Sequence, residues 1–429
     1  MNFDLPADLV AYLAKIDAFI EAEIKPLEER DDNIRFFDHR REWARTDFEA
    51  GGLPRHDWED LLVQAKTRAD AAGFYRFALP KEFGGQDGSN LWMAVIREHL
   101  AAKGLGLHND LQNEHSIVAN LPQVIMLREF GTAAQKEKFI KGMLDRTMRI
   151  SFGLTEEHHG SDATHMDTVA VRETRDGKPG WRIDGGKMWT TGMHHATHAI
   201  IFARTSGKAG DAKGISAFLM PADAPGVKIE EWLWTFNMPT DHPRISLTNV
   251  WVDDEALFGP PEGGLALAQS FVHENRIRQA ASSLGAAVYC IQESVKYARE
   301  RKPFGHSLSE NQAIQWPLVE LATQAEMLRL LIRKTAWQMD QMAQKDVAAT
   351  LSDKVSMCNY WANRMVCEAA DRAMQVHGGI GYSRHKPFEH IYRHHRRYRI
   401  TEGSEEIQMR KIAGFLFGYM GPNRKRDGE

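Results

Sequence analysis

The chain is poor in cysteine, has no long apolar run and carries almost no net charge. None of its three cysteines, Cys290, Cys358 and Cys367, stands in a paired metal-ligand spacing. Such a chain is typical of a reducing compartment and of a protein without disulfide bonds. No stretch approaches the roughly 20 apolar residues of a membrane-spanning helix. The N-terminus also lacks a basic segment followed by an apolar run, so we expect a cytoplasmic protein.

The balance of charges excludes a general affinity for polyanions. The 54 Lys and Arg residues and 58 Asp and Glu residues leave a formal net charge of −4. Proteins that bind nucleic acid or anionic membranes through their overall field are usually basic. One local run, from Arg393 to Arg399, mixes basic and aromatic side chains. We interpret this run as structural ion pairs or contacts with small-molecule phosphates, so neither nucleic acid nor a membrane is an expected partner.

The first third of the chain has a helical period. A length of 429 residues predicts two or three domains, and 43% hydrophobic with 26% charged residues is typical of a globular protein. Residues 31–58 are charged and weakly periodic, which indicates an excursion before the next helix. Before it, Pro26 is expected to end the first helix. That helix has an apolar residue every three or four positions, at Leu9, Leu13, Ile16, Ile20 and Ile24.

Residues 151–258 change to a strand pattern. Short β-rich runs at 200–202 and 215–219 lie between turn signals at 176–180 and 184–186. This alternation predicts an antiparallel β domain.

Residues 259–429 return to the helical period. Two apolar stripes predict long buried helices with short connections, which together make a four-helix bundle. A polar tail follows Gly421. The order of periods therefore predicts three domains, at 1–150, 151–258 and 259–429. The stripes are Leu321, Ala325, Leu328, Ile332 and Met339, then Val355, Ala362, Val366, Ala369 and Ala373.

The most informative segment, Arg399 to Gln408, places a carboxylate in a sharply turned loop before a helix. Gly403 allows a backbone conformation closed to other residues, and Ser404 can cap a helix that begins near Glu405. Glu402 then lies at the mouth of this helix, where the backbone aims its side chain. Taken alone, the segment is more typical of a solvated capping loop, because Glu is common near helix starts.

Four other motifs favour a functional role for Glu402 over a solvated capping loop. They are Phe152 to Asp162, Lys187 to Gly192, Arg301 to Gly305 and Gln375 to Tyr382. Together with the Glu402 loop, and in this order, they resemble the acyl-CoA dehydrogenase family, over most of the chain. The resemblance implies an α+β fold that is mostly α, with an N-terminal helical domain, a central β domain and a C-terminal four-helix bundle. It also implies FAD between the β domain and the bundle, with a neighbouring subunit over the far end of the dinucleotide.

The resemblance gives Glu402 a chemical role. Removing hydrogen from the Cα–Cβ bond of an acyl thioester needs a base for the α-proton and an acceptor for the β-hydride, and no side chain accepts a hydride. By resemblance the acceptor is FAD and the base is Glu402. Some members place the base on the first bundle helix, where this chain has Asn275, which cannot ionise. Glu405 and Glu406 fall on the following helix and are expected to stabilise its N-terminus.

Further positions match residues that contact FAD or substrate in the family. Thr155 matches a hydroxyl at the pyrimidine side of the flavin, and Ser161 matches one near the flavin phosphates and the substrate pantetheine. Arg301 matches an arginine that pairs with the FAD pyrophosphate across the subunit interface, which suits its planar fork. The expected cofactor-binding residues are Phe152, Leu154, Thr155, Gly160, Ser161, Trp189, Thr191, Arg301, Phe304, Gln312, Gln375, Gly378, Gly379, Ser404 and Glu406. The expected substrate-binding residues are Ser161, Gly403, Glu114, His115 and Arg276, the last near the adenine end of CoA.

Three departures from the family pattern bear on specificity. His158 and His159 stand in the segment that, by resemblance, contacts the flavin. Adjacent histidines cannot easily share one tetrahedral site, so no metal is expected. Thr401 replaces the usual aromatic residue and opens space beside Glu402. The segment from His108 to His115 matches the acyl-pocket region and is unusually polar. It disfavours a long unbranched acyl chain if it lines the pocket, and the alternative is that it faces solvent or a subunit contact.

By this resemblance we expect an FAD-dependent acyl-CoA dehydrogenase that forms trans-2-enoyl-CoA and passes electrons to an electron-transfer flavoprotein. A homo-oligomer, dimer or tetramer, is expected. Alternatives within the fold are an acyl-CoA oxidase, which would keep Glu402, and a non-catalytic acyl-CoA-binding subunit. Flavin monooxygenases of this fold lack the base and nitroalkane oxidases have Asp there, so Glu402 disfavours both. The non-catalytic subunit is disfavoured by the intact set Thr155, Ser161, Trp189, Thr191, Arg301 and Glu402.

Overall fold

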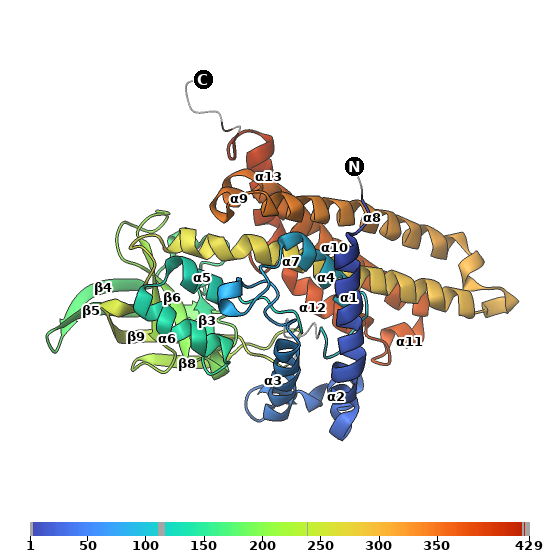
Figure 1. Ribbon diagram of the computed structural model, residues 1–429, viewed down its shortest axis with the longest axis horizontal. Coiled ribbons are helices and arrows are strands. Elements are labelled where there is room, and N and C mark those ends of the chain that lie inside the picture. The colour runs from blue at the N-terminus through green and yellow to red at the C-terminus, as the bar shows by residue number, and fades with distance from the viewer. Residues whose placement is uncertain (1–2, 110–115, 238, 423, 425–429) are drawn as a thin grey trace. The chain divides into compact units, whose positions relative to one another are not determined.

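The computed structural model of the chain describes residues 3–109, 116–237, 239–422 and 424 (Figure 1). Its contacts divide the chain into two compact units. A helical unit contains Met1–Ala44, His56–Asn120 and Val272–Glu429, and a β unit contains Arg45–Arg55 and Leu121–Phe271. The first helices of the chain therefore share a unit with the last ones, and the order of helical, β and helical segments confirms the predicted fold class. Most of the polar tail after Gly421 lies outside the described residues.

The helical unit is built around a bundle core. Its elements are α1 (Ala7–Phe19), α2 (Lys25–Glu29), α3 (His56–Ala71), α4 (Asn90–Ala101), α7 (Gly264–Glu300, from Val272 onward), α8 (Gln312–Asp340), α9 (Gln344–Thr350), α10 (Ser352–His377), α11 (Gly379–Tyr382), α12 (Phe388–Tyr398) and α13 (Glu405–Leu416). Side chains of α7, α8, α10 and α12 form the core, and both predicted apolar stripes are buried in it. The prediction of four long helices is correct for α7, α8 and α10, whereas α12 has only 11 residues.

The N-terminal helix α4 approaches α7 at a glycine. A Cβ atom on Gly285 would lie 2.2 Å from the carbonyl oxygen of Glu98, so only glycine allows this spacing. The Glu98 carboxylate binds Arg329 Nε at 2.6 Å and Arg333 Nη2 at 3.4 Å on α8. At the far end of α8, Asp340 accepts hydrogen bonds from the first residues of α4. These contacts fix α4 to the bundle that carries the Glu402 loop.

The helix predicted to stop at Pro26 continues to Glu29. A single π turn, Ile20–Ile24, separates α1 from α2, and the N–H of Lys25 donates to the carbonyl of Ile20, five residues back. Proline lacks an N–H and its ring crowds the preceding turn. The wider turn accommodates Pro26 at the start of α2, so the proline shifts the hydrogen-bond pattern without ending the helix.

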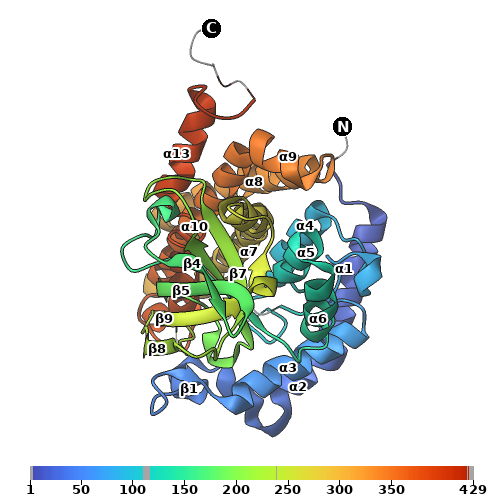
Figure 2. The same cartoon turned by 90° about the vertical axis from the view of Figure 1, so that its left-hand side faces the viewer.

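Among the described residues, eight strands form the sheet of the β unit (Figure 2). They are β3 (Ile150–Gly153), β4 (Val169–Arg175), β5 (Lys178–Met188), β6 (His198–Arg204), β7 (Ile215–Pro221), β8 (Val227–Trp232), β9 (Pro243–Asp253) and β10 (Leu257–Phe258). The order is β10-β7-β6-β4-β5-β9-β8, with β3 paired to β6. Most pairs are antiparallel as predicted, but β3 and β4 each run parallel to β6, so the sheet is mixed.

One of the two turn signals in this sheet is a turn and the other is not. Asp176 and Gly177 have φ of 51° and 75° and join β4 to β5 as a two-residue hairpin. The second signal, Asp184 to Gly186, lies inside β5, where the register with β9 shifts between Ile183 and Gly185. A β-bulge uses the same conformational freedom of glycine as a turn does, so the prediction of a turn there was wrong.

The excursion predicted at 31–58 lacks regular α-helix up to His56, as expected. It contains two 3₁₀ segments, Arg30–Phe36 and His39–Ala44, and a small hairpin of β1 (Thr46–Asp47) and β2 (Leu53–Pro54). The hairpin belongs to the β unit, which also holds α5 (Pro122–Phe130) and α6 (Ala133–Leu144).

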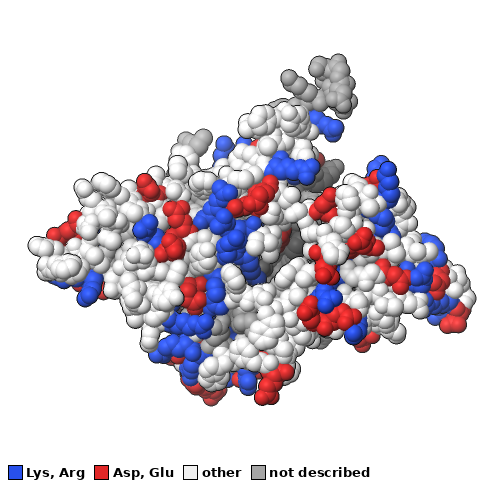
Figure 3. Space-filling model, turned by 180° about the vertical axis from the view of Figure 1, so that it is seen from behind, with Lys and Arg blue, Asp and Glu red and all other residues white. Residues whose placement is uncertain are grey.

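The state of the cysteines and the mixture of surface charges are as the composition suggests. Cys290, Cys358 and Cys367 are buried, free thiols on α7 and α10. None of the described helices combines the length and the apolar character needed to cross a bilayer. Acidic and basic side chains are interspersed over the face seen in Figure 3, as the small net charge suggests.

Candidate active site

The loop between α12 and α13 holds Glu402 in a strained turn. Glu402 and Gly403 have φ of 55° and 89°, a region that few residues other than glycine adopt. Ser404 caps α13 by accepting a hydrogen bond from the N–H of Ile407, and α13 begins at Glu405. A Cβ atom on Gly403 would lie 2.7 Å from a guanidinium nitrogen of Arg276. The turn, the cap and the helix start are therefore as predicted, and the positive φ of Gly403 favours glycine at this position.

Three side chains from about one turn of α7 contact this loop. Asn275 Nδ2 and Gln279 Nε2 donate to Oε1 of Glu402 at 2.9 and 3.0 Å. Arg276 Nε donates to the carbonyl oxygen of Glu402 at 3.1 Å, and its Nη2 contacts the same oxygen. Residues four apart share a helix face, which is why Asn275 and Gln279 reach the same atom. Sequence reasoning missed Gln279, whose spacing from Asn275 was the only available signal.

Arg276 is a buried cation tied to the base loop. Burial lowers the pKa of Arg276 to about 10, and the charge of Glu402 opposes that shift. The side chain is 6% exposed, so the guanidinium holds the backbone of the loop from inside the protein. Its expected contact with the adenine end of CoA stays a prediction.

Glu405 is occupied by two arginines. Arg364 and Arg399 each bind both of its carboxylate oxygens, at 3.0 to 3.1 Å. The hydrogen bonds from Arg399 and then Arg364 lower the pKa of Glu405 to about 2. Glu405 lies in the first turn of α13, as expected, and its carboxylate is also shared by these two cations. The Arg399 contact, with the Arg393–Glu389 pair at 2.6 Å, confirms structural ion pairing in the basic run.

A second group of expected residues lies in the β unit, where β3 and β5 end. Met188 N–H donates to the carbonyl of Thr155 at 2.9 Å, which joins the segment after β3 to the last residue of β5. The next residue, Trp189, has φ of 65° and a side chain 44% exposed. Thr191 is also exposed, and Thr155 is half-buried. The structure therefore places an indole and two hydroxyl-bearing residues on neighbouring segments, and their expected contacts with FAD stay a prediction.

These two segments are supported by a buried ion pair that sequence reasoning missed. Lys187 Nζ lies 2.6 Å from Oε1 of Glu156, and both side chains are buried. Glu156 also accepts from the backbone N–H groups of Asp167 and Thr168, at 2.6 and 3.0 Å. His159, Asp167 and Glu156 have ligand atoms within 4.8 Å of one another. Because Glu156 is committed to Lys187 and two N–H groups, we do not assign a metal to that cluster.

The third group lies at the ends of the bundle helices. Arg301 follows α7, Gln312 opens α8, and Gln375 stands near the end of α10; all three are exposed. Stacking of Tyr297 on His377, with ring centroids 4.3 Å apart, brings the ends of α7 and α10 together. Phe304, Gly378 and Gly379 are exposed as well. The expected contacts of this group with a dinucleotide thus map to one open end of the bundle.

The remaining expected residues divide into described and undescribed ones. Glu114 and His115 lie outside the described residues. Within the same segment, His108 and Asn109 are buried, and burial lowers the pKa of His108 to about 4. Gly160, Ser161 and Glu406 are exposed, and Phe152 and Leu154 are half-buried.

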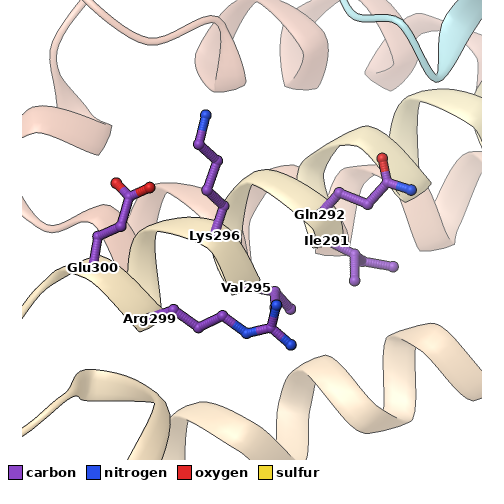
Figure 4. A pocket seen from close by; sticks show the side chains of 6 residues that line it. All are labelled: Ile291, Gln292, Val295, Lys296, Arg299 and Glu300. Atoms are coloured by element: carbon purple, nitrogen blue, oxygen red, sulfur yellow. The ribbon is translucent and has the colours of Figure 1, made fainter.

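A pocket of about 490 Å³ is lined by α7, and the Glu402 loop is not part of its lining (Figure 4). Its lining comes from α7 alone and mixes charged and apolar side chains. We assign no role to this pocket. The lining residues are Ile291, Gln292, Val295, Lys296, Arg299 and Glu300.

Comparison with known proteins identifies the family. Three family models match in chain order: the N-terminal domain of acyl-CoA dehydrogenase over residues 7–147, the middle domain over 151–250 and the C-terminal domain over 262–417. The chain belongs to the acyl-CoA dehydrogenase family. It is accordingly an FAD-dependent oxidoreductase, as the sequence predicted.

Individual relatives are similar over most of their length. The 3-(aryl)acrylate reductase of Clostridium sporogenes is 33% identical over 349 residues, which cover 80% of this chain and 87% of that protein. The caffeyl-CoA reductase-Etf complex subunit CarC of Acetobacterium woodii is 30% identical over 80% of this chain and 87% of its own. The solved structure of glutaryl-coenzyme A dehydrogenase with glutaryl-CoA superposes with a TM-score of 0.77 and 27% identity, over 100% of each chain.

The residues present fit FAD. An exposed indole beside Thr155 and Thr191 offers a flat apolar surface and hydrogen-bonding groups, which a flavin ring needs. Space is open around Gly378 and Gly379, where no heavy atom lies within 4 Å of an added Cβ. The exposed Arg301 can meet a pyrophosphate with its planar fork.

Proposed function

We propose that the protein removes hydrogen from Cα and Cβ of an acyl-CoA thioester and forms trans-2-enoyl-CoA, with Glu402 as the base for the α-proton. The observation that carries this proposal is the Glu402 loop itself. Its turn is fixed by positive φ at two residues, and Arg276 holds its backbone. The neighbouring Glu405 is occupied by two arginines. Glu402 is thus the positioned carboxylate of this loop.

Glu402 would act in the reaction through two groups, its carboxylate and its backbone N–H. Glu402 takes the α-proton, and its backbone N–H is the proposed donor to the thioester oxygen, which makes that proton more acidic. FAD, when bound, accepts the hydride that leaves Cβ. Thr155, Trp189 and Thr191 would hold the flavin ring, and Arg301 would bind the pyrophosphate of FAD in a neighbouring subunit.

A homo-oligomer is supported by an exposed apolar stripe on α8. Five apolar side chains on this helix lie either three residues or about two turns apart, and each is more than half exposed. They are Trp316, Val319, Met327, Leu330 and Trp337. Exposed apolar patches of this kind are typical of interfaces. We propose that α8 packs against another copy of the chain, in a dimer or a tetramer.

Electron-transfer flavoprotein is the proposed electron acceptor. The support is the relative whose name places it in a complex with Etf. We also propose a cytoplasmic location, because the three thiols are free and a reducing compartment keeps them so.

The proposed acyl group is bulky near the thioester, aryl or oxygenated. Thr401 is exposed beside the base, and His108 and Asn109 are polar and buried. The relatives named above act, by their names, on aryl acrylates, caffeyl-CoA and glutaryl-CoA. None of these names describes a plain long chain.

The same site could work in reverse, as a reductase of 2-enoyl thioesters, and the two relatives named as reductases favour this second candidate. Protonated Glu402 would then return a proton to Cα. The same bonds are made and broken in both directions, and the reduction potentials of the substrate and of the redox partner decide which direction the reaction takes.

The decisive experiment is anaerobic bleaching of the yellow protein by a panel of CoA esters. We expect bleaching, with branched, aryl or hydroxylated esters giving a higher kcat/KM than octanoyl- or palmitoyl-CoA. A higher value for a straight chain than for every other ester would refute the substrate class. Fast reoxidation by oxygen would identify an oxidase, and a colourless protein a non-catalytic subunit. Bleached enzyme that reduces an enoyl-CoA faster than the forward reaction runs would identify a reductase.

A further inference from the structure

One carboxylate oxygen of Glu402 accepts two amide hydrogen bonds. Asn275 Nδ2 and Gln279 Nε2 both donate to Oε1, at 2.9 and 3.0 Å. The two amides stand one turn apart on α7 and are 8% and 7% exposed. Such donors favour the charged form of a carboxylate over the protonated form.

Each of these amides is itself held by another amide. Asn120 Nδ2 contacts Oδ1 of Asn275, and Asn359 Nδ2 lies 3.3 Å from Oε1 of Gln279. A side-chain amide has one acceptor end and one donor end. Because the acceptor ends are occupied, the donor ends of Asn275 and Gln279 are directed at Glu402.

Asn359 connects the same network to the backbone of the loop. Its Oδ1 accepts from Gln408 Nε2 at 3.0 Å, and Gln408 Nε2 also donates to the carbonyl of Gly403 at 2.9 Å. Its Nδ2 donates to the carbonyl of Arg276 at 2.9 Å. Asn359 and Gln408 are completely buried. The side chain and the backbone of the base loop are thus attached to one network.

We propose that Asn120, Asn275, Gln279 and Asn359 form an amide relay that fixes Oε1 of Glu402 as a hydrogen-bond acceptor and makes Oε2 the oxygen that takes the α-proton. This inference rests on the proposed function. In the forward reaction the Cα–H bond breaks and an O–H bond forms at Oε2. The electron pair of the Cα–H bond becomes the second bond between Cα and Cβ, and FAD, when bound, would accept the hydride from Cβ. Asn275 and Gln279 are positioning residues, since they act through Glu402.

The physical basis is a difference between the two oxygens. Two N–H donors occupy the lone pairs of Oε1 and make it a poor proton acceptor, and they restrict rotation of the carboxylate about its terminal bond. A donor set that is already in place needs no rearrangement during the reaction. The relay also gives Asn275 a function that a carboxylate at this position could not provide, because a second carboxylate would repel Glu402.

The test compares two variants with a matched control on the same helix. Gln279→Met and Asn275→Leu each remove one donor, whereas Gln292→Met changes an exposed amide of α7. Two readouts are measured against pH: the rate of anaerobic flavin reduction, and the infrared band of the Glu402 carboxyl, identified as the band that Glu402→Gln removes. The infrared band reports protonation without turnover.

We expect each donor variant to shift the acidic limb of the rate and the infrared titration to higher pH by about one unit, because a hydrogen bond to a charged group is lost. Gln279→Glu should shift both further in the same direction. Gln292→Met should match the wild type. A purely structural role would lower the thermal midpoint and leave both titrations unchanged.

The relay is refuted if Gln279→Met and Asn275→Leu fold and titrate like the wild type. Should one of them fail to fold, Gln279→Glu and the remaining variant decide. Failure of the proposed function looks different: Glu402→Gln would then still bleach with substrate, whatever the relay variants do.

Discussion

Arg399 binds Glu405 through two parallel hydrogen bonds, Nε to Oε2 and Nη2 to Oε1, each 3.0 Å long. The two residues flank the base loop, the first just after α12 and the second at the start of α13. The bidentate pair therefore closes the loop at its base, while Arg276 and the amide relay hold its tip. Glu402 lies between these two attachments.

Glu402→Gln should retain the fold and the yellow colour and lose flavin reduction. The amide has the same shape but cannot accept the α-proton, and general-base catalysis is worth about 10²–10⁴-fold. Stopped-flow bleaching under anaerobic conditions measures the rate. Near-normal bleaching of this variant would contradict the assignment of the base.

Glu405→Gln should make the protein less stable at neutral pH and flatten its acid denaturation. Because the pKa of Glu405 is about 2 in the folded state, below its ordinary 4.5, its stabilisation is complete above pH 4.5 and is lost as pH falls through 2. The wild type should lose about 3 kcal/mol from this group over that window. Urea unfolding at several pH values measures it, with the exposed Glu406→Gln as the control. Parallel acid limbs for Glu405→Gln and the wild type would contradict the prediction.

Arg301→Ala should weaken FAD retention and oligomer stability together, since its proposed contact is with the pyrophosphate of a neighbouring subunit's FAD. The flavin-to-protein ratio and the gel-filtration size are measured on one sample. Lys302→Ala, which removes the adjacent exposed cation, is the control. If Arg301→Ala keeps both values, Arg301 is only a charge at the end of α7.

Lys187→Met and Glu156→Gln should each destabilise the protein and release flavin, because each leaves a buried charge without its partner, at a cost of about 3–5 kcal/mol. The double variant should lose less than the sum. Thermal unfolding with free-flavin fluorescence measures both effects. The exposed Lys228–Glu230 pair, 2.7 Å apart, is the matched control, with an expected coupling of at most about 1 kcal/mol. Additive losses for the buried pair would show that the two charges do not depend on each other.

Sequence reasoning succeeded where the signal is local. The Ser404 cap, the positive φ of Gly403 and the Asp176-Gly177 hairpin depend on neighbouring residues, so the residue types were sufficient. It failed where one residue pattern is compatible with two different local structures. Gly185 serves a bulge inside a strand, and Pro26 follows a π turn inside a continuing helix.

The partners of the base could not be predicted, because they come from distant parts of the chain. Asn275 and Gln279 precede Glu402 by 127 and 123 residues, and Glu156 precedes Lys187 by 31. No periodicity specifies such pairs; they follow from the packing of α7 against the loop and of β5 beside the segment after β3. The motifs located the base, and the fold supplied the groups that hold it.

The alkylation rates of the three buried thiols measure how often the bundle opens. Burial raises the pKa of Cys358 to about 12 and of Cys367 to about 11, and it raises that of Cys290 as well. The thiolate is the form that alkylating reagents attack, so the folded bundle is protected twice, by occlusion and by protonation. Alkylation therefore proceeds only through opening of α7 or α10. Cys358 immediately precedes Asn359, so its labelling rate reports how often the packing around the amide relay comes apart.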